Sequence, residues 1–211
     1  MGHFFVLMQL SRFFAIFGTM FSFETIEQSV EKGGIFFISD FAETDNYEAV
    51  RKALQRLEKA NKIKRIAKGI YLLPKKHERF GYINPHAEQI ATAIAKRDKA
   101  RIIATGATAL NLLGLSTQIP VNVVFLTDGS ARKIKIGNQS IQFKKTNPKN
   151  LSIKHRLTNL IIQALKAIGE NNVTNEQVDK IHEIIERSNE KELVYKNLRN
   201  APFWIQKLLS K

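Results

Sequence analysis

The residues whose type and spacing could do chemistry in this sequence are lysines and arginines. Between positions 51 and 79 there are eleven basic residues and two acidic ones, Glu58 and Glu78. Positions 20 to 50, by contrast, contain one basic residue, Lys32, and seven acidic ones. Clustered ammonium and guanidinium groups neutralise phosphates and release counterions, which is a main source of affinity for nucleic acids. The basic segment therefore predicts a surface that binds a polyanion.

Composition limits the classes of protein to which the chain can belong. Lys and Arg total 33 against 19 Asp and Glu, a net charge of +14 at pH 7, which favours a polyanionic partner. There is no cysteine, so disulfides, thiolate catalysis and Cys-based zinc sites are excluded, and we expect a cytoplasmic protein. The five histidines are scattered without an i, i+4 pair. We therefore expect neither a metal site nor a cofactor.

Enzyme chemistry has little support in the sequence. Gly129-Ser130 matches the start of a nucleotidyltransferase signature, but such a site also needs paired carboxylates downstream to hold a metal. The next acidic residue after Asp128 is Glu170. The sequence has no GxxxxGK[ST] phosphate loop, no HExxH and no nucleophile elbow. We therefore expect a binding protein rather than an enzyme.

The elements that would position the basic side chains can be predicted along residues 20–80. Apolar residues at helical spacing predict a first helix over 21–31, which Gly33-Gly34 ends. Over 34–43 a short extended run leads into a one- or two-turn helix with Ser39 as its N-cap. An amphipathic helix over 46–60 precedes two strands, 63–66 and 70–73, joined by a turn that contains Gly69. This order is typical of a winged helix-turn-helix, whose third helix enters the major groove while the hairpin, the wing, lies along the DNA backbone.

The helix predicted over 46–60 has the clearest pattern. Val50, Leu54 and Leu57 lie on one apolar stripe that faces a core, so the opposite face points to solvent. Asp45 and Glu48 have the spacing of a capping box, with Asp in place of the usual Ser or Thr. Tyr47 is expected to pack in the core rather than to stack on a base.

The side chains predicted to contact DNA share an outward position and a hydrogen-bonding or cationic group. Those nearest the start of the helix have donors or acceptors suited to purine edges, whereas the other cations suit phosphates. The predicted set is Asn46, Arg51, Lys52, Gln55, Arg56, Lys59, Lys62, Lys64, Arg65 and Lys68.

Residues 81–211 predict a mixed α/β domain that ends in helices. A helix over 85–96, a strand over 101–104, a helix that ends at Gly114 and a buried strand over 119–127 come first. A hairpin over 133–145 follows, with Gly137-Asn138 as its two-residue turn. Three helices are expected over 151–168, 174–188 and 192–209, the last with Trp204 in a core or an interface.

A second basic surface is predicted on the hairpin over 133–145. Its alternation places Ile134, Ile136, Ile141 and Phe143 on one face, and on the other face Lys133, Lys135 and Lys144. These lysines either protect an exposed strand from aggregation or make additional contacts to DNA or RNA.

The sequence therefore predicts an α+β fold with an N-terminal winged helix-turn-helix, 20–80, and a mixed α/β C-terminal domain, 81–211, that ends in helices. The apolar segment 1–19 is interrupted by Gln9, Ser11 and Arg12. Its clean apolar stretches are shorter than the roughly 20 residues needed to span a bilayer, so no membrane partner is expected. The segment is either an upstream extension, with Met20 as the native start, or an extra packing helix.

Three sequence strings together carry a family resemblance: VRKALQRLEKANKIKRIAKGIYLLP, ATGATALNLLGLSTQIPVNVVFLTDGSARK and NLRNAPFWIQKLL. From about Met20 onward the chain resembles the AbiEi-type antitoxins of bacterial type IV toxin-antitoxin systems, which take part in phage defence. The most specific part is the G-x-T-A-L-x-x-x-G-L-S-T-Q segment over 106–118. The apolar segment before Met20 departs from the family pattern.

The resemblance implies a transcriptional autorepressor that is also an antitoxin. It implies a winged helix that binds inverted repeats in its own promoter, and a C-terminal domain needed to counter a nucleotidyltransferase-like toxin without a stable complex. Two-fold operators would suit a homodimer on DNA, although no segment of the sequence indicates a dimer interface. By their place in the motif, the family's DNA-contacting positions correspond to Arg51, Lys52, Gln55, Arg56, Lys64, Arg65 and Lys68.

Two alternatives remain open at this point. The winged helix could serve as a protein-docking module whose charge meets an acidic partner, or both basic hairpins could bind RNA. Preference for the upstream DNA over random duplex at physiological salt separates the repressor from the protein-docking module. Competition between structured RNA and promoter DNA separates it from the RNA-binding protein.

Overall fold

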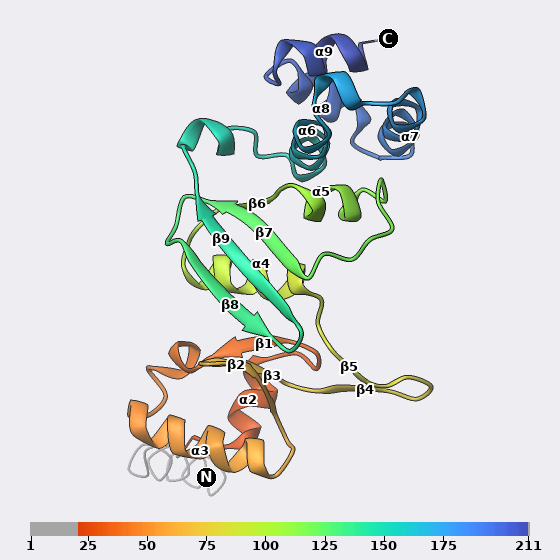
Figure 1. The fold of residues 1–211 in the computed structure, drawn as a ribbon. Helices are drawn as coiled ribbons and strands as arrows, with labels where there is room; N and C mark the ends of the chain where they lie inside the picture. Colours follow the sequence, from red (N-terminus) through yellow and green to blue (C-terminus); the bar gives the residue numbers. More distant parts are fainter. Residues whose placement is uncertain (1–20, 211) are drawn as a thin grey trace, which may run out of the picture. The chain divides into compact units, whose positions relative to one another are not determined.

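The computed structural model describes residues 21–210, and the chain divides into two compact units, Met1–His86 and Ala87–Lys211 (Figure 1). The predicted apolar extension, 1–19, lies outside the described residues. The division follows His86, whereas the predicted boundary followed residue 80, because a second hairpin continues the first unit to Ile83. Both units contain helices and sheets, so the fold is α+β, as predicted.

The first unit has the predicted order of elements. Helix α2 (Phe23–Ser29) leads to strand β1 (Ile35–Phe37), the 3-10 helix η1 (Ile38–Phe41) and helix α3 (Tyr47–Lys59). Strands β2 (Lys64–Ala67) and β3 (Ile70–Leu72) follow, and the sheet has the order β1-β3-β2 with both pairs antiparallel. The predicted N-cap of η1 was wrong: the cap is Phe37, whose N–H donates to the Asp40 carboxylate at 2.9 Å.

The core of the first unit lies between α2, α3 and this sheet. Phe36 of β1 and Tyr71 of β3 are cross-strand partners with ring centroids 5.6 Å apart, and Phe41 packs edge-on against Phe36 at 5.9 Å. Ile26 and Leu54, one from each helix, are fully buried in the same cluster. Each such side chain contributes about 1.5–3 kcal/mol by burial. This packing fixes the inner stripe of α3 and leaves its outer face to solvent.

A second hairpin, absent from the sequence-based expectations, follows the first directly. Strands β4 (Lys75–His77) and β5 (Gly81–Ile83) pair antiparallel, with His77 opposite Gly81. In the ribbon view the hairpin extends away from the three-stranded sheet (Figure 1). Its strands are only three residues long, and all of β4 is exposed.

The second unit is built on a four-stranded sheet of order β6-β7-β9-β8. Its strands are β6 (Ile102–Ala104), β7 (Asn122–Thr127), β8 (Arg132–Ile136) and β9 (Gln139–Lys145); β7 and β9 run parallel and the other pairs antiparallel. Helix α4 (Ala87–Arg97) packs against β6 and β9, and α5 (Ala107–Leu112) against β7. The predicted hairpin is confirmed, with Ile136 opposite Gln139 across the two-residue turn.

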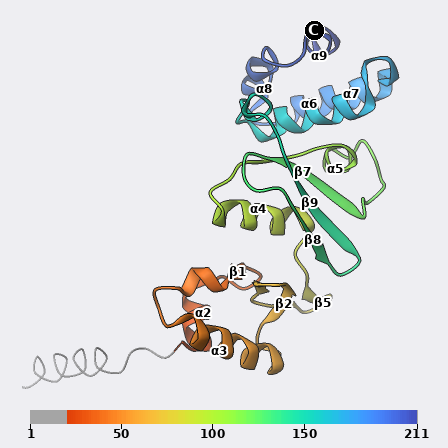
Figure 2. The same cartoon turned by 60° about the vertical axis from the view of Figure 1, so that its left-hand side comes forward.

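The C-terminal helices gather in a layer of their own (Figure 2). After the short 3-10 helix η2 (Pro148–Leu151) come α6 (Arg156–Ile168), η3 (Glu170–Asn172) and α7 (Asn175–Glu186), as predicted apart from their bounds. The single helix expected over 192–209 was wrong. It is two helices, α8 (Lys191–Leu198) and α9 (Phe203–Leu209), because Pro202 at the N-cap of α9 cannot continue the preceding helix.

Two kinds of feature are missing from residues 21–210. None of their helices is long and apolar enough to cross a membrane. They also contain no cluster of three or more His, Cys, Asp or Glu residues that could hold a metal ion.

Candidate nucleic-acid interface

Helix α3 carries the first part of the candidate interface. Its N-cap is Asn46, whose side-chain oxygen accepts from the backbone N–H groups of Glu48 and Ala49 at 2.8 and 3.4 Å. The predicted capping box on Asp45 was therefore wrong, and the Asp45 carboxylate instead accepts from the N–H groups of Phe21 and Asn46. These two hydrogen bonds occupy the side-chain oxygen of Asn46, so only its side-chain NH₂ group remains to donate to a base.

The outer face of α3 presents several exposed polar side chains. Four of the predicted residues are exposed here and line a shallow hollow of about 480 Å³ together with Phe21, Asp45 and Ala49. They make no ion pair with any other residue in the part of the chain that the structure describes. These four are Lys52, Gln55, Arg56 and Lys59.

Arg51 has a different environment from that predicted. Its guanidinium donates through Nε and Nη2 to both carboxylate oxygens of Glu48, one turn earlier, at 2.8–3.2 Å. The hydrogen bonds and charge of Glu48 raise the pKa of Arg51, and those of Arg51 lower the pKa of Glu48. A phosphate must compete with this carboxylate for Arg51, and it meets the repulsion of Glu48 as well.

The wing strands carry the next group of predicted residues. Lys64 and Arg65 are exposed on β2, and Lys68 is exposed in the turn that leads to β3. Gly69 closes the turn with φ +73°, a left-handed conformation that favours glycine. The ladder shifts register between Arg65 and Ala67, and such a bulge increases the local twist of a strand.

Lys62, the residue before this hairpin, is directed elsewhere. Its ammonium lies 4.9 Å from the centroid of the Phe23 ring in α2, a cation–π contact. Its charge also contributes, after a hydrogen bond to Ser22, to lowering the pKa of Glu24. Lys62 is nevertheless exposed, so its assignment to DNA contact stays a prediction.

One aromatic prediction also needs correction. Tyr47, expected in the core, is 62% exposed at the first turn of α3, beside the outer polar face. In α9, Ile205 and Leu209 are buried, Trp204 is half-buried and Phe203 is 79% exposed.

The second predicted basic surface lies in the other unit. Lys133 pairs across the ladder with Gln142, and Lys144 pairs with Leu126, so these side chains share one face of the sheet with Lys135. All three lysines are exposed, while Ile141 and Phe143 on the opposite face are buried. The predicted alternation is therefore confirmed, and the interpretation of the lysines as edge protection or as a binding surface stays open.

Sequence reasoning missed the cations and aromatic rings of β4–β5. Lys75, Lys76, Arg79, Phe80 and Tyr82 are all exposed on this hairpin. The signal that could have revealed them is the run KKHERFGYI, in which Gly81 marks a turn between two short polar segments.

Comparison with known proteins places the chain in a family. A family model described as "Family of unknown function (DUF6088)" matches residues 23–193. The chain belongs to this family. No curated protein matches it. Among solved structures it is similar to the crystal structure of the RV2827C protein from Mycobacterium tuberculosis, with 14% identity, a TM-score of 0.42, and coverage of 83% of this chain and 71% of that chain.

Proposed function

We propose that this DUF6088 protein is a DNA-binding transcriptional autorepressor that acts in the cytoplasm as the antitoxin of a type IV toxin-antitoxin system. Its first unit serves as a winged helix-turn-helix, with α3 in the major groove and β2–β3 on the phosphate backbone. The second unit provides the antitoxin activity against a nucleotidyltransferase-like toxin. The proposal assigns no enzymatic step to the chain.

The observation that carries the DNA-binding half is the outer face of α3. The inner stripe of this helix is buried, so packing fixes its orientation, while Lys52, Arg56 and Lys59 stay exposed. Arg65 and Lys68 on the neighbouring hairpin have the same sign of charge. Five cations that each displace counterions from one phosphate would give a slope of log K against log salt of about −4.5.

Base reading would fall to the few polar side chains at the start and middle of α3. Gln55 is exposed and offers both a donor and an acceptor, which suits the N6 and N7 edge of adenine. Asn46 retains its amide donor only, and Arg51 becomes available when a phosphate or base displaces it from Glu48. The helix therefore offers fewer base contacts than phosphate contacts, and we expect moderate sequence specificity.

The antitoxin half rests on the resemblance to the AbiEi-type family and on no single site in the second unit. It is supported by the segment over 106–118, which forms α5 and the loop after it. In this loop Ile119 and Val121 are 74% and 63% exposed. The test is co-expression with the neighbouring toxin gene, with cell growth as the readout, and failure of rescue would remove this half alone.

The test of the DNA-binding half is the double variant Lys52→Glu, Arg56→Glu on the full chain. Binding to the duplex upstream of its own gene should fall by at least about 30-fold in roughly 0.15 M salt, since two phosphate contacts are lost. A matched control reverses two exposed cations of the second unit, Lys196→Glu and Lys207→Glu, and should bind as the parent does. Equal loss in both variants would mean that only total charge matters, which contradicts the proposal.

A further inference from the structure

The hairpin β4–β5 is a feature that the proposed function leaves without a role. Its turn and strands bury very little: Phe80 is 79% exposed, Tyr82 is 65% exposed and the whole of β4 is exposed. An isolated two-stranded hairpin of this size is marginally stable in water. Its form must therefore be supported from its base.

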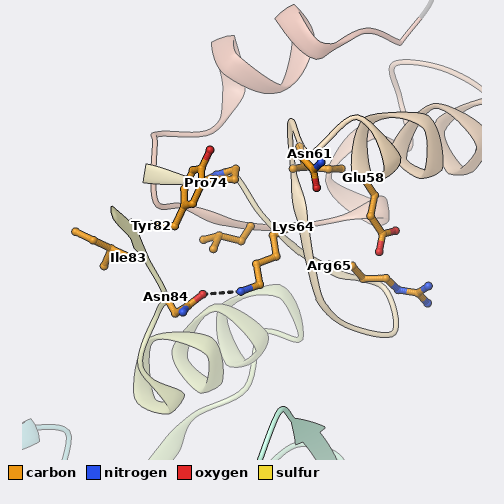
Figure 3. Close-up of a pocket in the computed structure, with 10 residues that line it drawn as sticks. Glu58, Asn61, Lys64, Arg65, Pro74, Tyr82, Ile83 and Asn84 are labelled. Carbon is orange, nitrogen blue, oxygen red and sulfur yellow. Dashed lines mark hydrogen bonds between the residues drawn. The ribbon is translucent and has the colours of Figure 1, made fainter. Parts of the chain in front are cut away.

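The base of the hairpin is held on two sides. Before β4, Leu73 exchanges backbone hydrogen bonds with Gly33 and Gly34 at 2.7 and 3.0 Å, and a Cβ added at Gly33 would lie 3.5 Å from the Cβ of Lys75. After β5, the side-chain oxygen of Asn84 accepts from the Lys64 ammonium at 2.8 Å (Figure 3). Both ends are thus attached to the body of the first unit.

One of these attachments joins the hairpin to the proposed wing. Residues from the end of α3, from β2 and from β5 line a common cleft of about 640 Å³, with Glu58, Arg65 and Tyr82 among them (Figure 3). The hairpin therefore starts next to the strand that carries Lys64 and Arg65. A duplex that lies on the wing would continue toward β4–β5.

The tip of the hairpin presents a cation and an aromatic ring together. The backbone N–H of Arg79 donates to His77 Nδ1 at 3.2 Å, and the His77 and Phe80 rings lie 5.0 Å apart. Gly81 completes the turn with φ +69°. Arg79 and Phe80 are exposed at this end, and Lys75 and Lys76 lie along the stem.

This combination matches the chemistry of minor-groove contact. Proteins that enter the minor groove use arginine or lysine together with apolar side chains such as Phe, and a two-stranded ribbon with solvated cations can lie along the phosphates. The charges and the ring therefore favour a duplex over an acidic protein surface.

We propose that β4–β5 is a second DNA-contacting element, which places Arg79 and Phe80 in the minor groove of the duplex that flanks the segment entered by α3. Lys75 and Lys76 contact the phosphates on either side. The inference deepens the proposed function and rests on it, because a duplex must first be bound by α3 and the wing.

The first test removes the hairpin cations in the full chain with Lys75→Ala, Lys76→Ala and Arg79→Ala combined. Binding to the upstream duplex is measured by fluorescence anisotropy from about 0.05 to 0.3 M salt. The salt slope should decrease by about 2 to 3, at about 0.9 per lost phosphate contact. A matched triple variant of the second unit, Lys96→Ala, Lys196→Ala and Lys207→Ala, should keep the parent slope.

The second test addresses the groove. Netropsin, which occupies the minor groove of A·T pairs, is added to a duplex with an A·T flank. It should weaken binding of the parent protein to the level of the triple hairpin variant and leave that variant's own affinity unchanged. Phe80→Ala alone, at a position that is 79% exposed, should weaken binding about 3- to 10-fold and change the thermal midpoint of unfolding little.

The outcomes separate this inference from the proposed function. If the parent protein has no preference for its upstream duplex, the proposed function fails. A second outcome is that the parent prefers that duplex while the hairpin variants bind it with the parent's affinity and salt slope. In that case only the hairpin assignment is overturned, and β4–β5 becomes a surface for protein or RNA. Sensitivity of the triple variant to netropsin would likewise overturn the minor-groove contact.

Discussion

The two basic hairpins with two-residue turns, β2–β3 and β8–β9, look alike locally and differ in their surroundings. Both turns contain one glycine in a left-handed conformation, Gly69 with φ +73° and Gly137 with φ +54°. Both carry exposed lysines on the strands or the turn. In the first unit, however, the hairpin stands beside a helix with an exposed cationic face and is followed by another cationic hairpin. In the second, the lysines occupy one face of a four-stranded sheet.

Under the proposed function, the two hairpins are distinguished by their surroundings and not by their local charge. Lys133 and Lys135 lie on β8, an edge strand of its sheet, where cations discourage pairing with another chain. Arg65 lies on β2, which is likewise an edge strand of its sheet, so the same argument applies to it. What differs is that helix α3 of the same unit also presents exposed cations. Cooperation between neighbouring elements therefore distinguishes the proposed interface from edge protection.

The largest expected effect comes from reversing charge on each hairpin in turn. Arg65→Glu with Lys68→Glu should weaken binding to the upstream duplex by at least about 30-fold, because two phosphate contacts are lost and repulsion is added. Lys133→Glu with Lys135→Glu, matched in charge, should change it less than about 3-fold. Anisotropy titrations of both variants check this, and comparable losses would remove the distinction between the hairpins.

A smaller effect is expected from the turn glycines. Gly69→Ala and Gly137→Ala should each lower the free energy of unfolding by about 1 kcal/mol, since both residues have positive φ and neither Cβ would meet another atom within 4 Å. Urea denaturation measures this loss. Only Gly69→Ala should also weaken DNA binding, and a similar DNA defect in Gly137→Ala would extend the interface to the second unit.

Removing the carboxylate that holds Arg51 should strengthen DNA binding. Glu48→Gln weakens the pairing at Arg51 and removes a negative charge beside the DNA, so the affinity for the upstream duplex should rise about 3-fold. The matched control is Glu183→Gln, which breaks a comparable exposed pair with Arg187 in α7 and should leave DNA binding unchanged. A fall in affinity for Glu48→Gln would show that Glu48 positions Arg51 for binding.

The smallest effect concerns the sheet that supports β8–β9. Arg101 donates to Asp128 through its Nε and its backbone N–H, and these bonds lower the pKa of that carboxyl. The Arg101–Asp128 pairing therefore contributes its full stability above the pKa of Asp128 in the unfolded chain, about 3.9. This stability is lost as pH falls through the lower pKa that Asp128 has in the folded protein. Asp128→Asn should lower stability by less than about 1 kcal/mol at pH 7. Urea denaturation across pH should show this difference vanish in strong acid.

Much of the fold could be predicted because its signals are local. The stripe of Val50 and Leu54 predicted α3, and Gly137-Asn138 predicted the turn between β8 and β9. The hairpin β4–β5 was missed because its three-residue strands bury too little to show apolar alternation. Pro202 could have predicted the break between α8 and α9, but the apolar periodicity across it led to the prediction of one helix.

The candidate site could be predicted in outline but not in its pairings. The spacing of Glu48 and Arg51 was visible as an i, i+3 pair, so this ion pair could have been found from the sequence. The contact of Lys62 with the Phe23 ring depends on how α2 packs and has no local signal. Asn46 and Asp45 are adjacent and both suit an N-cap, so only backbone geometry decides between them.

The most direct test of the central claim is a competition titration of the full chain on its own upstream duplex at roughly physiological salt. The competitor is a scrambled duplex of equal length and base composition. The proposal predicts a preference of at least about 10³-fold for the upstream sequence, the lower end of what specific DNA-binding proteins show. Equal binding to both duplexes, with the same salt slope, would contradict it and reduce the α3 face to a general polyanion surface.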